Sequence, residues 1–316
     1  MRSNSLFAAT LVFSNPHITD DRIDKKFRCV KLIAFAQVVS PLLRLNCLVA
    51  ALLCLWPPIA LAKEALLDVT GRWYPGAILQ GRVPPGSSVE VLGRSPHITP
   101  DGVFVFGLGR DAKDEVSISV KTSSGNSQNF RFAVEPRDYA IQKIEGVKKE
   151  HVTPPESVLA RIRQENSLVR KARKTNDLRT DFLEDFIWPL KGRITGVYGS
   201  QRYYNGVPRS PHYGIDIAGP VGAPVKAPAS GIVTLVHEDM YYSGGTLILD
   251  HGHGVSSTFI HLSKILVNEG ERIKRGQTIA KVGASGRATG PHLDWRMNWF
   301  DQRVDPELLV QGKRME

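Results

Sequence analysis

The sequence predicts a mainly β chain, in which a small N-terminal β-sandwich and a linking helix precede a C-terminal antiparallel β-sheet or flattened barrel. Three observations favour this fold class. Short runs of alternating apolar and polar residues recur between turn residues over 63–135. Segment 136–185 is rich in charge and has apolar residues at helical spacing, and short strand-like runs rich in glycine and proline continue through 186–316. We expect these three parts to follow a separate leading segment, 1–62.

The leading segment combines an N-terminal extension with an export signal that follows it. The apolar run LNCLVAALLCLWPPIALA follows Arg44 and ends in small residues before Lys63, which is the layout of a secretory signal peptide. We expect export to the periplasm or cell envelope, with Lys63 as the mature N-terminus. A membrane anchor is the alternative, although the run is about as short as a spanning helix can be and a proline pair interrupts it. Because the extension is long and mixed, translation from Val30 or Val38 is a further hypothesis.

The overall composition restricts the chemistry that the chain can perform. Its three cysteines, Cys29, Cys47 and Cys54, all precede Lys63, so a metal site further along must use His, Asp or Glu. The 41 basic and 31 acidic residues give a net charge of +10, but no basic block interleaved with aromatic residues is present. This pattern argues little for a nucleic acid partner and fits a polyanionic surface such as a cell envelope equally well.

The segment 63–135 reads as the β-sandwich. Its runs AILQGRV, SSVEVLG, GVFVFGLG, VSISVKT and QNFRFAVEP alternate with period two and are separated by Gly, Pro, Asn and Asp. No group of His, Asp or Glu with ligand spacing occurs in them. We expect a packing or targeting module, and an envelope protein partner could bind through 63–185.

One amphipathic helix of roughly five turns is expected in the charged segment that follows. Thr153 and Glu156 match a capping box, and Pro154 would occupy the first helical position. Val158 and Ile162 begin an apolar stripe at helical spacing. The helix is interpreted as a connector that packs on one of the neighbouring parts, with a partner-binding helix as the alternative.

The C-terminal part contains three histidine-bearing spots, of which HYGID is the first. In a strand His212 and Asp216 share one face, and Gly214 between them permits a bend that brings the two side chains together. Either the aspartate is a second metal ligand or it is the hydrogen-bond partner of a ligating histidine.

His261 in TFIHLSK and the pair His292 and Asp294 in GPHLDW are the other two spots. The pair shares a strand face, with the two residues about 7 Å apart. The three spots together offer more groups than a closed structural site requires, whereas a catalytic zinc site needs three ligands, an open position and groups that move protons. His251 and His253 in LDHGHG are left out, because the flanking glycines indicate a hairpin turn.

The runs HYGIDIAGPVGAPVKAPASGIV, GGTLILDHGHGVSSTFIHLS and VNEGERIKRGQTIAKVGASGRATGPHL closely resemble the lysostaphin-type (LytM-like) zinc metalloendopeptidases of bacterial cell walls. The resemblance covers about residues 186–309, in order and without large gaps. It implies a fold of the duplicated hybrid motif type. It also implies a secreted or periplasmic enzyme that hydrolyses peptidoglycan peptides, in stem peptides or cross-links, with one Zn²⁺ ion.

The resemblance implies that His212 and Asp216 bind the zinc, while His261 and His292 handle water and developing charge. The family has a histidine as third ligand, and this sequence has Asp294 in that place. Aspartate is an acceptable ligand with a shorter side chain, but a second carboxylate lowers the net charge of the zinc site from +1 to zero. The bound water should then have a higher pKa, so cleavage would be slower or need higher pH.

A working hydrolase is the favoured interpretation, with His261 as general base and His292 stabilising the oxyanion or sharing the proton. Mn²⁺ is a possible substitute for zinc, because it accepts oxygen ligands well. Arg287 and either Tyr203 or Tyr204 are expected to contact substrate, although solvated loop residues would look the same in the sequence.

The alternative from another class is a catalytically silent scaffold or activator that holds peptidoglycan or a protein. A lipoyl-like carrier is disfavoured, because no lysine lies at a tight hairpin tip.

Overall fold

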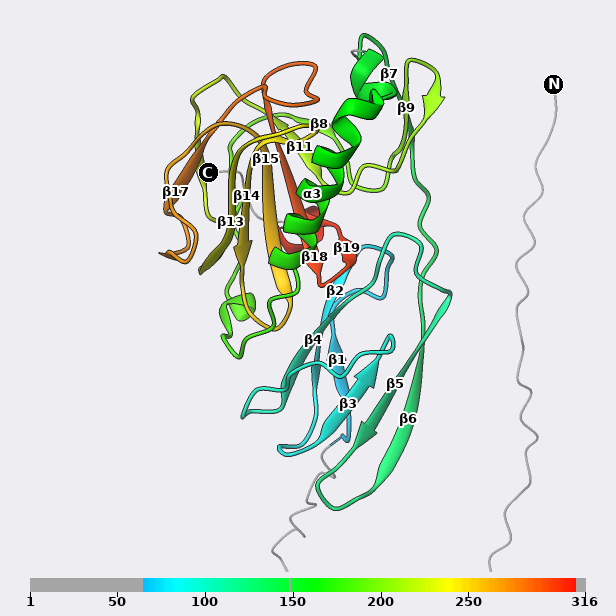
Figure 1. The fold of residues 1–316 in the computed structure, drawn as a ribbon. Coiled ribbons are helices and arrows are strands. Elements are labelled where there is room, and N and C mark those ends of the chain that lie inside the picture. Colours follow the sequence, from blue (N-terminus) through cyan, green and yellow to red (C-terminus); the bar gives the residue numbers. More distant parts are fainter. Residues whose placement is uncertain (1–64, 148, 311–316) are drawn as a thin grey trace, which may run out of the picture. The chain divides into compact units, whose positions relative to one another are not determined.

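The computed structural model describes residues 65–147 and 149–310, drawn in colour in Figure 1. The expected export signal and its extension therefore lie outside the described residues. The described part is mainly β, as predicted, and most of its strands pair in antiparallel sheets. Within these two ranges, no helix has the length and the apolar character that crossing a bilayer requires.

The N-terminal strands form two three-stranded antiparallel sheets. One contains β1 (Asp68–Thr70), β2 (Ile78–Arg82) and β4 (Val103–Gly107), and the other contains β3 (Ser88–Val91), β5 (Glu115–Lys121) and β6 (Ser127–Ala133). Exposed and buried residues alternate strictly along β5, where Val116, Ile118 and Val120 point inward. The predicted period-two pattern is therefore present, while the borders of this part at 63 and 135 stay predictions.

The connecting segment contains more than the single predicted helix. Strand β7 (Ile141–Ile144) and the short helix α2 (Lys149–Val152) precede helix α3 (Glu156–Ala172), and β7 pairs in parallel with β9 (Gln201–Tyr204). The predicted capping box is wrong. Pro155 occupies the N-cap position, and no side chain caps the helix. The residue before a proline is disfavoured in the helical region, so the Pro-Pro pair keeps Thr153 out of reach of the first turn.

Helix α3 packs on the main sheet, and its role as a connector stays a prediction. Ala172 lies in a small apolar cluster with Leu235, Met240 and Ile248. Near the middle of the helix, the buried Glu165 accepts hydrogen bonds from the Tyr241 backbone N–H at 2.9 Å and from Arg161 at 2.6 Å. The helix is therefore fixed by apolar contacts and by a satisfied buried carboxylate.

The C-terminal strands form a ten-stranded antiparallel sheet, whose main path runs β16, β13, β14, β15, β18, β11 and β8 (Figure 1). The strands of this path are β8 (Ile194–Gly196), β11 (Ile215–Ala218), β13 (Gly231–Met240), β14 (Gly244–Asp250), β15 (Val255–Ile265), β16 (Arg272–Ile273) and β18 (His292–Trp299). Off the path lie β12 (Pro224–Lys226), β17 (Thr278–Val282) and β19 (Gln302–Val304). The remaining elements are β10 (Val207–Pro208), the 3-10 helix η1 (Asp181–Leu183) and α4 (Pro306–Val310).

Strand β18 has an apolar face and a polar face, because side chains alternate along a strand. Leu293, Trp295, Met297 and Trp299 are fully buried on the core face. His292, Asp294, Arg296 and Asn298 form the opposite face, on which Asp294 and Asn298 are also buried. Burying polar side chains is unfavourable unless they find partners, so the second face of β18 marks a place where function is expected.

The first prediction concerns the buried His251, whose Nδ1 lies 2.7 Å from the Ser230 carbonyl oxygen and whose Nε2 lies 2.8 Å from the Ser257 hydroxyl. Burial lowers the pKa of His251 to about 4. Between pH 6.5 and 4 the unfolded chain therefore binds a proton that the folded chain does not. This residue should lower the free energy of unfolding by up to about 1.4 kcal/mol per pH unit as the pH falls.

Urea unfolding between pH 7 and pH 4.5 measures this dependence. The slope of stability against pH should be flatter in His251→Gln than in the parent. His237→Gln, at a partly exposed position on β13, should keep the parent's slope. Equal slopes in the parent and in His251→Gln would contradict the assignment.

Candidate metal centre and catalytic site

The three predicted metal ligands lie together at the junction of β11 and β18. The register of these strands places Asp216 opposite Asp294, and His212 lies in the loop before β11. His212 Nε2 is 3.1 Å from Asp216 Oδ1 and 3.4 Å from Asp294 Oδ2. One ligand atom from each of the three buried residues lies within 4.8 Å of the others. The cluster can therefore hold a cation, and its binding of a metal remains a prediction.

The local backbone differs from the single strand face that the sequence indicated for HYGID. Strand β11 begins only at Ile215, after a bend at Gly214. A Cβ atom on Gly214 would lie 2.6 Å from both Asp294 Oδ1 and the Trp295 carbonyl oxygen. The glycine is needed because β18 approaches it closely, and not for an unusual φ angle.

Hydrogen bonds orient His212 and leave one carboxylate oxygen unused. His212 Nδ1 lies 3.2 Å from the Val197 carbonyl oxygen, which can only accept, so Nδ1 carries the proton and Nε2 faces the carboxylates. Asp216 Oδ1 is buried and has no hydrogen-bond donor among the described residues. Burial opposes a charge on His212, but Asp294 and Asp216 raise its pKa. An unsatisfied buried oxygen beside an imidazole nitrogen that faces two carboxylates fits a cation at this point.

Two arginines, which the sequence analysis did not single out, pair with the two aspartates. Arg296 donates to Asp294 through Nε at 2.9 Å and through Nη2 at 2.6 Å, and Arg202 Nη2 donates to Asp216 Oδ2 at 2.5 Å. Against the effect of burial, Arg296 and His212 hold the pKa of Asp294 well below its usual range. Arg296 follows Asp294 by two residues on one strand, so the alternation of side chains could have indicated this pair.

His261 and His292 face the same centre, with their ring centroids 4.8 Å apart. Each ring holds its Nδ1 2.8 Å from a backbone carbonyl oxygen, that of Ser285 for His261 and that of Gly290 for His292. In each ring Nδ1 therefore donates to that carbonyl oxygen and Nε2 is turned the other way, and the Nε2 of His292 lies 3.7 Å from Asp216 Oδ1. Burial lowers the pKa of His261 to about 4, with Asp294 opposing this shift and His292 adding to it.

The backbone at His261 is strained. Its φ is +64°, and the pairing of β15 with both neighbouring strands shifts register nearby. Left-handed backbone is unfavourable for a residue with a Cβ, and such strain often marks functional sites. His261 lies inside β15, close to this irregularity.

The predicted substrate residues Tyr204 and Arg287 line a cavity of about 260 Å³ beside His212. The Arg287 guanidinium lies 4.7 Å from the centre of the Tyr204 ring, which fixes both side chains at the wall. Arg202, Arg209, Arg296 and Arg303 also line this cavity. Of the two tyrosines considered for substrate contact, Tyr204 lines the cavity and Tyr203 does not, while Tyr213 also lines it.

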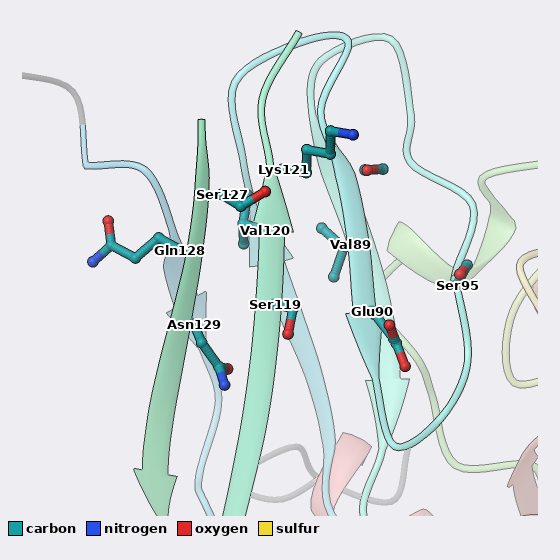
Figure 2. A pocket seen from close by; sticks show the side chains of 10 residues that line it. Val89, Glu90, Ser95, Ser119, Val120, Lys121, Ser127, Gln128 and Asn129 are labelled. Atoms are coloured by element: carbon teal, nitrogen blue, oxygen red, sulfur yellow. The ribbon is translucent and has the colours of Figure 1, made fainter. Parts of the chain in front are cut away.

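The N-terminal sheet has a separate hollow of about 410 Å³, shown in Figure 2. It is lined mainly by short polar side chains of β3, β5 and β6, with Glu90 and Lys121 as its charged members. No cluster of potential metal ligands occurs there among the described residues. Among the described residues, the candidate metal ligands therefore lie in the C-terminal sheet and in the loop before β11.

Comparisons with known proteins agree with this location of the site. Residues 210–306 match the family described as Peptidase family M23. The peptidoglycan DD-endopeptidase ShyA of Vibrio cholerae is 37% identical over 124 residues, which are 39% of this chain and 26% of that protein. The DD-carboxypeptidase/endopeptidase Mpg of Neisseria meningitidis is 39% identical over 95 residues, 30% of this chain and 22% of that protein. The chain thus spans about a quarter of the length of these relatives.

One solved structure matches far beyond that segment. A protein from Pseudomonas aeruginosa, provisionally described as peptidase M23, superposes with a TM-score of 0.60 and 29% sequence identity. The match covers 76% of this chain and 96% of that protein. The shared fold therefore extends beyond residues 210–306 to most of the described chain.

The second prediction tests the close approach of β18 to the loop before β11. Gly214→Ala should lower the free energy of unfolding by about 1–3 kcal/mol, because the new methyl group would displace Asp294 and the Trp295 carbonyl. Gly290→Ala is the matched control, since a Cβ atom there meets open space. Chemical unfolding of the three proteins checks this. Equal stability of Gly214→Ala and the parent would contradict the described packing.

Proposed function

From the premise that residues 210–306 form a Peptidase family M23 domain, we propose that this chain is a peptidoglycan metalloendopeptidase exported to the periplasm or cell envelope. It would hydrolyse peptide bonds in stem peptides or their cross-links. The observation that carries the proposal is the convergence of two histidines, each held through Nδ1 by a backbone carbonyl oxygen, on the cluster of His212, Asp216 and Asp294.

The three clustered residues are the ones that would hold the ion, which we take to be Zn²⁺, with Mn²⁺ as a possible substitute. The unsatisfied Oδ1 of Asp216 and the Nε2 of His212, which faces Asp216 and Asp294, support this assignment. When bound, the ion supplies a Lewis acid for the scissile carbonyl and a water of lowered pKa.

The two remaining histidines would move the protons. His261 is neutral at pH 7, since burial lowers its pKa to about 4, so its Nε2 can accept a proton from the attacking water. His292 approaches from the start of β18 and would stabilise the oxyanion or share that proton. The hydrogen bonds of both Nδ1 atoms to backbone carbonyls keep the rings in these orientations.

The ion pair of Asp294 with Arg296 compensates for the missing third histidine. Asp294 alone would lower the net charge of the centre, but the guanidinium of Arg296 adds one positive charge at hydrogen-bond distance. The pair together is neutral, as an imidazole is, so the positive character of the centre is retained. We infer that Asp294 and Arg296 act as one unit in the position of the family's histidine.

The cationic cavity beside His212 suits a peptide that carries carboxylates, because arginine binds carboxylate with paired hydrogen bonds. Arg287 and Tyr204 would contact the substrate there. The names of the relatives include DD-endopeptidase and DD-carboxypeptidase, and we extend cleavage of stem-peptide bonds to this chain on the same basis.

One observation favours a second candidate, a silent scaffold that binds peptidoglycan or a protein. Each aspartate of the cluster already has an arginine partner, so the charges of the site balance without a cation. The unsatisfied Asp216 Oδ1 speaks against this candidate. Zinc content and peptide release from purified peptidoglycan, measured on the exported chain, separate the two. A chain that binds no metal and cleaves nothing at any pH would overturn the enzyme proposal.

The third prediction assigns the proton transfer. His261→Gln should keep the zinc affinity of the parent and lose about 10²- to 10⁴-fold in cleavage rate, because it removes the base and none of the ligands. Zinc titration and release of peptides from peptidoglycan measure the two properties. His237→Gln should change neither of them. A large loss of zinc affinity in His261→Gln would show that this histidine is a ligand.

The fourth prediction tests the Asp294–Arg296 unit. Asp294→His alone leaves the Arg296 guanidinium beside the ion without its carboxylate partner. The cleavage rate should fall more than tenfold, because a partly buried charge without a partner is unfavourable. Adding Arg296→Gln should restore much of the loss. Zinc affinity and rates for the two single variants and the double variant give the coupling. Additive effects would mean that the two residues act independently.

A further inference from the structure

A second cationic cavity, of about 490 Å³, lies where α3 ends near β18 and β19. Five basic residues and one acidic residue line it. The acidic one, Asp301, is paired with Arg94 at 2.5 Å. Four cations, Arg170, Arg173, Lys174 and Arg303, therefore face the cavity without an acidic partner in its wall. None of the predicted metal ligands or catalytic histidines lines it.

Two of these cations have buried N–H groups without acceptors. Arg173 Nε and Arg303 Nη1 are buried and form no hydrogen bond, and neither residue has an ion pair among the described residues. Arg173 donates only through Nη2, at 2.9 Å from the Thr258 hydroxyl. The carbonyl end of α3 favours a cation nearby, but it offers no acceptor to these two nitrogens.

The two guanidinium groups also repel one another. Burial, followed by the charges of Arg303 and Arg296, holds the pKa of Arg173 well below its usual range. Burial and Arg296 likewise lower the pKa of Arg303 to about 10. Removing a charge from water is unfavourable unless an opposite charge and hydrogen bonds compensate for it. An anion in the cavity that both residues line would supply the opposite charge, and could bond to the guanidinium nitrogens that face the cavity.

We propose that this basic pocket binds an oxyanion, a phosphate or carboxylate group, through Arg173 and Arg303. Planar guanidinium groups bind such oxygens in pairs of hydrogen bonds. The cavity has the size of sites for small organic ligands, and the ring of Phe300, with the Arg94 guanidinium 4.8 Å from its centre, gives it an aromatic wall. Arg303 also lines the cavity beside His212, so the bound anion would change the charge next to the catalytic centre.

Calorimetric titration of the exported chain with inorganic phosphate, acetate and glucose 1-phosphate, at constant ionic strength, tests the proposal. Saturable binding at one site is expected. Tighter binding of glucose 1-phosphate than of inorganic phosphate would indicate a phosphate group carried on a sugar. Equal affinity for the two phosphates would indicate free phosphate. Tighter binding of acetate than of either phosphate would indicate a carboxylate ligand. The readout is binding alone, so it is independent of any peptidase activity. Absence of saturable binding of all three would overturn the proposal.

Arg173→Gln should lower the affinity for the anion at least about tenfold, which is the effect of losing a hydrogen bond to a charged group. In buffer without the anion it should melt at the same temperature as the parent or higher, because an uncompensated buried charge is removed. If Arg173 had only a structural role, the variant would melt at a lower temperature than the parent. Lys174→Gln, at an exposed position on the rim, should weaken binding about two- to fivefold without affecting folding.

Arg163→Gln is the matched control, since Arg163 is exposed on α3 and does not line the cavity. It should bind the anion as the parent does. Parent-like affinity in both Arg173→Gln and Lys174→Gln would overturn the proposal. If Arg173→Gln does not fold, Lys174→Gln decides, and parent-like affinity in that variant overturns the proposal.

Discussion

The pairing of β18 with β11 on one side and β15 on the other is the constraint on which the candidate site depends. It places Asp294 opposite Asp216 and also opposite Ile260, the residue that precedes His261. The core face of β18 is filled by two tryptophans, a leucine and a methionine, all fully buried. Because a slip of one residue would exchange the two faces of the strand, the apolar core fixes the register in which the polar groups meet.

Much of the site could be predicted, because strand alternation links the printed sequence directly to the faces of a sheet. His292 and Asp294 were placed on one strand face, and β18 has that geometry. Helix α3 followed from an apolar stripe, but its start did not, since the effect of a proline on the preceding residue outweighs a capping motif. The left-handed backbone at His261 depends on contacts with neighbouring strands, which no local pattern records.

The arginines show most clearly what motif reasoning overlooks. Arg296 lies two residues from the predicted ligand Asp294, but a search for metal-ligand residue types does not select arginine. Arg202 comes from β9, which also pairs with the unforeseen strand β7. Electrostatic balance is a property of the assembled site. A count of potential ligands in the sequence therefore describes the metal's donors without describing the charge that the metal would meet.

The alternation along β18 has a consequence for how this site can change over evolutionary time. Positions 294 and 296 share a face and a pair of hydrogen bonds, so a substitution at one alters the selective pressure at the other. A chain with histidine at 294 has no carboxylate there to neutralise an arginine at 296. The two positions should covary, and chains that combine histidine with arginine should be rare intermediates between two stable solutions.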